Sequence, residues 1–104
     1  MKEVTIETFK SEVEESTQPV LVKFFATWCG PCKAMSPILE ELAAETPSVK
    51  FVEVNVERAR DLAVRYRVRA VPTLMLFVEG ALVTVKVGAA TKTEIADLLT
   101  GLRK

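Results

Sequence analysis

Apolar residues occur along this 104-residue chain with two different spacings. Short unbroken or alternating runs predict strands, whereas apolar residues three and four positions apart predict helices. The predicted strands are Val4 to Ile6, residues 20–26, Phe51 to Val56, Thr73 to Val78 and Leu82 to Val87. The predicted helices are roughly 8–16, 32–45, a segment from Asn55 or Glu57 through Tyr66, and 91–103 with Ile95, Leu98, Leu99 and Leu102 on one face. The order βαβαβαββα indicates a mixed central sheet covered by helices.

Local signals refine several of these elements. Residues 20–26 are apolar on both faces, which predicts a central strand. Glu79-Gly80 predicts a hairpin turn between two antiparallel strands. The segment Thr91 to Glu94 fits a capping box that begins the last helix. Pro37 lies inside the pattern of residues 32–45 and predicts a kink, because proline removes one hydrogen bond of the helix.

Length and charge restrict the function classes. A chain of 104 residues is expected to form one domain with its own core. Its 14 basic and 14 acidic residues give a net charge of zero, which favours neither nucleic acid nor an anionic membrane as partner. No apolar stretch approaches the roughly 20 residues of a membrane span, and the first residues lack the apolar core of a signal peptide. We therefore expect a cytoplasmic protein.

The chain has two cysteines and no histidine. A Cys–His nucleophile, a histidine base and a histidine metal ligand are therefore excluded, and two cysteines cannot close a structural zinc site. In the cytosol a lone cysteine pair is more often catalytic or metal-binding than structural. A zinc ion shared between two chains and an inert buried pair remain as alternatives, but redox chemistry is favoured and no metal is expected.

The two cysteines lie within Trp28-Cys29-Gly30-Pro31-Cys32, between a predicted strand and a predicted helix. Gly30 and Pro31 favour a bend there, because glycine accepts unusual backbone angles and proline fixes its own φ. Cys29 is expected near the helix N-terminus, where unpaired N–H groups and the helix dipole stabilise a thiolate. A thiolate is the form that attacks disulfides.

The sequence Trp28 to Lys33, followed about 40 residues later by Val71-Pro72-Thr73, resembles the thioredoxin family. Pro37 and the segment Lys86 to Ala89 support the resemblance, which extends from the first strand to the last helix. It implies an α/β thioredoxin fold, with a central mixed five-stranded sheet flanked by four helices, and a single domain over residues 1–104.

The resemblance also implies a role for individual residues. Cys29 would attack the substrate disulfide, and Cys32 would resolve the mixed disulfide that forms. Pro72 would be a cis-proline that faces the cysteines, and the backbone of Val71 would pair with a substrate strand. A flat contact surface around an exposed Cys29 sulfur would be formed by Trp28, Gly30, Pro31, Ala70 and Gly88.

Two charged positions depart from the family pattern. Thioredoxins usually carry a buried aspartate six residues before the first active-site cysteine and a lysine on the neighbouring strand; this chain has Lys23 and Glu53 at those positions. The charges look exchanged, and we expect the two side chains to touch. The alternative is that Lys23 extends its ammonium to the surface. As catalytic groups, Lys23 would stabilise the Cys32 thiolate or transfer its proton as a neutral amine, or Glu53 would transfer it through water.

The predicted function is that of a monomeric thiol–disulfide oxidoreductase. It would reduce disulfide-containing proteins, bind no cofactor, and be reduced again by a flavin-dependent thioredoxin reductase, as the resemblance implies. A second hypothesis is a binding or assembly module of the same fold, in which the surface around Trp28 matters and the thiols are dispensable. A third is a dedicated reductase that supplies electrons to one enzyme only.

Overall fold

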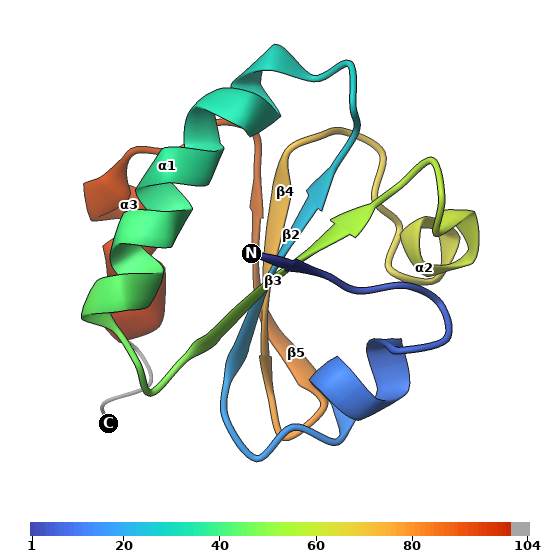
Figure 1. The fold of residues 1–104 in the computed structure, drawn as a ribbon, viewed down its shortest axis with the longest axis horizontal. Coiled ribbons are helices and arrows are strands. Elements are labelled where there is room, and N and C mark those ends of the chain that lie inside the picture. The colour runs from blue at the N-terminus through green and yellow to red at the C-terminus, as the bar shows by residue number, and fades with distance from the viewer. Residues whose placement is uncertain (101–104) are drawn as a thin grey trace.

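The fold is built around a five-stranded sheet (Figure 1). The computed structural model describes residues 1–100. Strands β1 (Lys2–Glu3), β2 (Val20–Phe25), β3 (Lys50–Asn55), β4 (Thr73–Val78) and β5 (Ala81–Val87) lie in the order β1-β3-β2-β4-β5. The pairs β1–β3 and β2–β3 are parallel, whereas β2–β4 and β4–β5 are antiparallel. The predicted mixed five-stranded sheet is therefore confirmed.

Helices cover both faces of this sheet (Figure 1). Helices α1 (Gly30–Glu45) and α3 (Lys92–Thr100) lie on one face, and the π-helical turn η1 (Lys10–Glu14) and α2 (Arg60–Arg65) lie on the other. Of the four predicted helices, three are thus α-helices and one is a π-helix. None of the helices within residues 1–100 has the length and apolar character needed to span a membrane.

Each layer of helices packs on its own group of buried side chains. Under η1 and α2 the largest are Phe9, Phe24, Phe77 and Leu62, and under α1 and α3 they are Leu21, Leu39, Leu74, Leu76 and Ile95. Strand β2 contributes to both groups and is buried along almost its whole length, as a central strand should be. Lys23 is the only charged residue in β2, which places a cation inside the sheet beneath α1.

The first strand and the first helix differ from the prediction. The strand lies at Lys2–Glu3, not over Val4 to Ile6, although the Val4 N–H still donates to the Glu53 carbonyl at 2.7 Å. The Thr5 N–H instead donates to the Thr8 hydroxyl at 2.9 Å, a local turn that diverts the chain from the sheet. The predicted helix 8–16 is reduced to the short turn η1.

The predicted hairpin turn and the predicted capping box are confirmed. Both Glu79 and Gly80 have positive φ, at 51° and 80°, as a two-residue hairpin turn requires. The Thr91 N–H donates to the Glu94 carboxylate at 2.9 Å and the Glu94 N–H to the Thr91 hydroxyl at 3.1 Å, which is the predicted capping box. Helix α1 continues through Pro37 to Glu45. The last predicted helical residues, 101–103 with Leu102, lie outside the described part of the chain.

Candidate redox site

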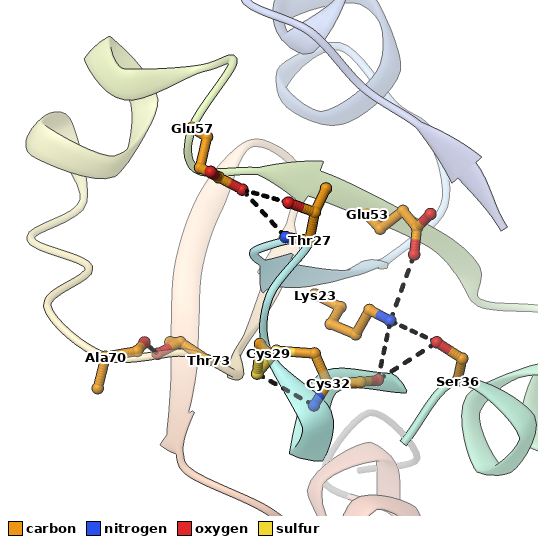
Figure 2. Close-up of a disulfide and its surroundings, with 9 residues drawn as sticks. All are labelled: Lys23, Thr27, Cys29, Cys32, Ser36, Glu53, Glu57, Ala70 and Thr73. Carbon is orange, nitrogen blue, oxygen red and sulfur yellow. Dashed lines mark hydrogen bonds and ion pairs between the residues drawn. A yellow bond between two sulfur atoms is a disulfide. The ribbon is translucent and has the colours of Figure 1, made fainter. Parts of the chain in front are cut away.

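The two cysteines meet at the start of α1, directly after β2 (Figure 2). Cys29 is the N-cap residue, with φ −84° and ψ 105°, and its sulfur accepts a hydrogen bond from the Cys32 N–H at 3.1 Å. Pro31 is accommodated in the first helical turn because its missing N–H would have no helical partner there. The Cα atoms of Cys29 and Cys32 are 5.3 Å apart and the sulfurs form a disulfide. The predicted cap position is confirmed. Gly30 and Pro31, which were predicted to form a bend, form the first turn of α1, and Gly30 has no positive φ.

The sulfur of Cys29 is less accessible than predicted. Cys29 is only 3% exposed in this oxidised form, so the expectation of an exposed sulfur is wrong. The reason is that its side chain turns back to the helix N–H and packs in a small cluster with Ala26, Cys32, Val56 and Val71. A substrate must therefore reach Cys29 through the residues that surround it.

The predicted contact residues differ in how far they are exposed. Trp28 is 72% exposed, and Gly30, Pro31 and Ala70 are also exposed, whereas Val71 and Gly88 are partly buried and Pro72 is buried. Trp28 shares a hollow of about 140 Å³ with Val56, Val68, Arg69, Ala70 and Val71. On the other side, Pro31 shares a hollow of about 90 Å³ with Ala34, Met35, Ile38, Ala89 and Ala90.

Pro72 lies directly before β4 and contacts the residue that follows β5. The Val71–Pro72 peptide bond is cis, as predicted for a proline at this position. The Gly88 N–H donates to the Pro72 carbonyl at 2.8 Å, and Gly88 has φ 92°, a conformation that favours glycine. Gly88 and Pro72 are thus neighbours in space although they are 16 positions apart in the chain.

The buried cation of β2 points at the first turn of α1 (Figure 2). Lys23 Nζ lies 3.3 Å from Glu53 Oε1, donates to Ser36 Oγ at 2.7 Å and donates to the Cys32 carbonyl at 3.4 Å. Its side chain is 3% exposed, so the alternative in which the ammonium extends to solvent is wrong and the predicted contact with Glu53 is present. The sheet register explains the contact, because Lys23 and Glu53 are direct partners on the parallel strands β2 and β3.

Three acceptors around Lys23 match the three N–H donors of an ammonium group. The ring of Phe25 adds a weaker contact, with its centroid 5.3 Å from Nζ. A hollow of about 280 Å³ brings these groups together with Cys32; it is lined by Lys23, Phe25, Ala26, Thr27, Cys32, Lys33, Ser36 and Glu53. The site therefore combines a redox disulfide with a buried positive charge beside a hollow.

Two residues that shape the site were not predicted from the sequence. Ser36 lies one helical turn after Cys32, and this spacing of four residues was a signal that the two share a helix face. Glu57 accepts hydrogen bonds from the N–H and the hydroxyl of Thr27, at 3.0 and 2.9 Å, and these bonds lower the pKa of the Glu57 carboxyl. Glu57 thereby holds the loop that presents Trp28. No local pattern could reveal this contact, which spans 30 positions.

A redox disulfide at the start of a helix, on a mixed sheet covered by helices on both faces, defines a thiol–disulfide oxidoreductase. The family model named thioredoxin matches residues 1–101, and the chain belongs to the thioredoxin family. This family membership supports the role of a protein-disulfide reductase and redox carrier. The alternative of a binding module with dispensable thiols is not favoured.

Several curated relatives are similar over almost their whole length. The chain is 46% identical to thioredoxin 1 of Synechococcus elongatus over 97 residues, which cover 92% of this chain and 91% of that protein. It is 45% identical to thioredoxin C-2 of Corynebacterium nephridii over 96 residues, 91% of this chain and 89% of that protein. It is 40% identical to thioredoxin of Pseudomonas aeruginosa over 97 residues, 92% and 90% of the two chains.

Proposed function

We propose that this protein is a general reductant of protein disulfides, acting as a single-domain cytoplasmic monomer over residues 1–104. A flavin-dependent thioredoxin reductase would return it to the dithiol form. The observation that carries the proposal is the Cys29–Cys32 disulfide at the N-terminus of α1, beside the cis Val71–Pro72 bond and the exposed Trp28. No cofactor takes part, because both electrons of each reduction come from the two thiols.

The reaction has two exchanges. The Cys29 thiolate attacks one sulfur of the substrate disulfide, so that a Cys29–substrate bond forms and the other substrate sulfur leaves as a thiolate. The Cys32 thiolate then attacks Cys29, which re-forms the Cys29–Cys32 disulfide and releases the second substrate sulfur. The substrate gains two electrons and, from solvent, two protons. The N-cap position supports Cys29 as the first nucleophile, because a helix N-terminus stabilises negative charge.

Backbone groups next to Pro72 support the proposed mode of substrate binding. Within residues 1–100, the N–H and carbonyl of Val71 have no hydrogen-bond partner. They are therefore available to pair with an extended substrate segment, as in β-strand addition. The proposed contact residues surround that segment, with Trp28 on one side and Gly30, Pro31, Ala70, Pro72 and Gly88 completing the surface.

Lys23 and Glu53 are proposed to act on the thiol of Cys32. Their place in the hollow beside Cys32, and the contact of Lys23 with the Cys32 carbonyl, support this assignment. A cation at this position would favour the Cys32 thiolate, whereas a neutral amine or the Glu53 carboxylate would carry its proton. A fixed charge and a proton carrier make different predictions for substitutions at Lys23 and Glu53.

The proposal is tested by trapping and by a coupled assay. In a Cys32→Ser variant the mixed disulfide cannot be resolved, so we expect many cellular proteins to be captured on Cys29 and released by dithiothreitol. The Cys29→Ser variant is the matched control and should capture few. Capture of a single protein would contradict a general reductase. In the coupled assay, a flavin-dependent thioredoxin reductase oxidises NADPH and reduces this protein, which in turn reduces insulin. Absence of NADPH oxidation in this assay would contradict the proposed electron donor.

Two further measurements test the remaining parts. A reduction potential of the Cys29/Cys32 couple below the cytosolic glutathione poise is expected for a reductant, and a potential well above that poise would contradict it. Sedimentation of the oxidised and reduced protein should give the mass of one chain, 11.5 kDa. A larger mass at micromolar concentration would contradict the monomer. Cell fractionation tests the cytoplasmic location.

A further inference from the structure

Ser36 has a defined place in the hydrogen bonds beneath the disulfide (Figure 2). Its Oγ accepts from Lys23 Nζ at 2.7 Å and donates to the Cys32 carbonyl at 3.3 Å. Because the hydroxyl has one hydrogen, accepting from Lys23 directs that hydrogen towards Cys32. The same carbonyl accepts from Lys23 at 3.4 Å. Lys23, Ser36 and Cys32 thus form a closed triangle of donors and acceptors inside the fold.

The triangle holds the cation in one place. β2 supplies Lys23, β3 supplies Glu53, and the first turns of α1 supply Ser36 and the Cys32 carbonyl, so three separate elements converge on one ammonium group. The β4 residue paired with Lys23 is Leu74, which carries no charge. Among residues 1–100, the only other cation lining the hollow is Lys33, which is exposed and therefore more strongly screened by water.

We propose that Ser36 is a positioning residue that fixes the Lys23 ammonium against Cys32, and that Lys23 acts there as a permanent positive charge, not as a carrier of protons. This inference rests on the proposed role of Cys32 as the resolving thiol. Three acceptors for three N–H groups suit the charged form of lysine. A neutral amine has two N–H groups and would need the Ser36 hydroxyl as its donor, which would take that hydrogen away from the Cys32 carbonyl. Glu53 offsets part of the charge from the side away from Ser36.

The fixed charge would act before the second exchange. The Cys32 thiol loses its proton to water in the hollow, and the thiolate then attacks Cys29 with loss of the substrate thiolate. A nearby cation favours the Cys32 thiolate. During the attack on Cys29 the negative charge passes from the Cys32 sulfur to the substrate thiolate that leaves. Resolution should therefore be possible at neutral pH without a buried carboxylate base.

The first test is the pH at which the Cys32 thiolate forms. It is measured by thiolate absorbance near 240 nm in a Cys29→Ser background, which needs no access to the buried sulfur. Lys23→Met should raise the midpoint by about one pH unit, the lower end of the effect of a nearby opposite charge, because Nζ contacts the backbone carbonyl of Cys32 and lines the same hollow. Ser36→Ala should raise it by less, and Ser36→Thr should restore it because the hydroxyl returns. Glu53→Gln should lower it, because the cation is no longer offset.

The second test separates a fixed charge from a proton carrier. Arginine keeps the positive charge but cannot be deprotonated in a protein. The rate of mixed-disulfide resolution in Lys23→Arg should therefore stay within about threefold of the unchanged protein, while Lys23→Met slows it about tenfold at pH 7. If Lys23→Arg misfolds, Ser36→Ala and Glu53→Gln still test the inference through the thiolate midpoint. Lys33→Met, which removes an exposed lysine, is the control and should shift that midpoint less than Lys23→Met.

Each result has a defined meaning. An unchanged midpoint in both Lys23→Met and Ser36→Ala would overturn the inference, even if the unchanged protein still reduces insulin and captures substrates through Cys29. Equal loss of resolution in folded Lys23→Arg and Lys23→Met would assign proton transfer to Lys23 and overturn the fixed charge. Slower resolution in Glu53→Gln would assign the proton to Glu53, with the same consequence. Absence of insulin reduction in the unchanged protein would instead contradict the proposed function.

Discussion

Removing Glu53 and removing Lys23 from their ion pair should lower the free energy of unfolding by different amounts. The charges are 3.3 Å apart, which corresponds to an attraction of about 5 kcal/mol at an effective dielectric constant of 20, before desolvation is subtracted. The Lys23 side chain is 3% exposed, whereas that of Glu53 is 22% exposed. Removing Glu53 therefore leaves a cation in the core, while removing Lys23 leaves a carboxylate that water can reach.

We expect Glu53→Gln to lower the free energy of unfolding by about 1–3 kcal/mol. This is less than the roughly 3–5 kcal/mol for breaking a fully buried pair, because Ser36 and the Cys32 carbonyl still accept from Lys23. Lys23→Met should lower it by about 1 kcal/mol or less, since methionine fills the core beside Phe25 without a charge. The double variant should be more stable than Glu53→Gln alone.

The assay is urea unfolding of the oxidised proteins, followed by circular dichroism, with the three variants combined in a double-mutant cycle. A loss of 1 kcal/mol should lower the melting temperature by about 4–8 °C in a domain of this size. Lys92→Met is the control, because Lys92 pairs with Glu41 and Glu45 on the surface. Its removal should shift the urea midpoint less than Glu53→Gln does. A larger loss in Lys23→Met than in Glu53→Gln would refute the reasoning from burial.

Three other predictions concern the surface, the core and the substrate site. Glu12 forms hydrogen bonds with Lys2 and Lys50, which lower the pKa of its carboxyl to about 2. The contribution of Glu12 to stability is therefore complete above pH 4.5 and is lost as the pH falls towards 2. Glu12→Gln should flatten the acid-unfolding curve over that interval. Phe77→Ala should lower the free energy of unfolding in urea by about 3–5 kcal/mol, because Phe77 is buried against two aromatic rings; a loss below 1 kcal/mol would contradict its place in the core. Trp28→Ala should reduce kcat/KM for insulin by roughly tenfold and leave the urea midpoint unchanged, since Trp28 is 72% exposed; an equal rate would remove it from the contact surface.

Elements with strong local patterns could be predicted from the sequence. The apolar run of residues 20–26 indicated a central strand, and β2 occupies Val20–Phe25. Thr91 and Glu94, three positions apart, indicated the start of a helix. Both hydrogen bonds of the predicted capping box are present. These features depend on residues that are neighbours in the chain. Backbone conformation and side-chain hydrogen bonds act over a few residues, so the pattern is sufficient.

The errors arose where local and distant interactions compete. Alternation at Val4 and Ile6 suggested a strand, but the Thr5–Thr8 hydrogen bond turns the chain away from β3 after Val4. The sulfur of Cys29 was expected at the surface, because the resemblance to the thioredoxin family implied a contact surface around an exposed sulfur. Its burial depends on Val56 and Val71, which arrive from two other parts of the fold. The resemblance placed Val71-Pro72 near the cysteines, but no local pattern showed that Val56 and Val71 would cover the sulfur.

The type and order of the main elements, and the place of the redox pair at a helix N-terminus, could be predicted from the amino-acid pattern, and the resemblance indicated the family. The resemblance also showed that the usual charges were exchanged at Lys23 and Glu53. The meaning of that exchange depends on how the elements pack. The register of β2 with β3 brings the two charges together, and the packing of α1 on the sheet adds Ser36, 13 positions from Lys23. The strength of such contacts depends on burial and distance, which are set when separate elements pack and not by spacing along the chain.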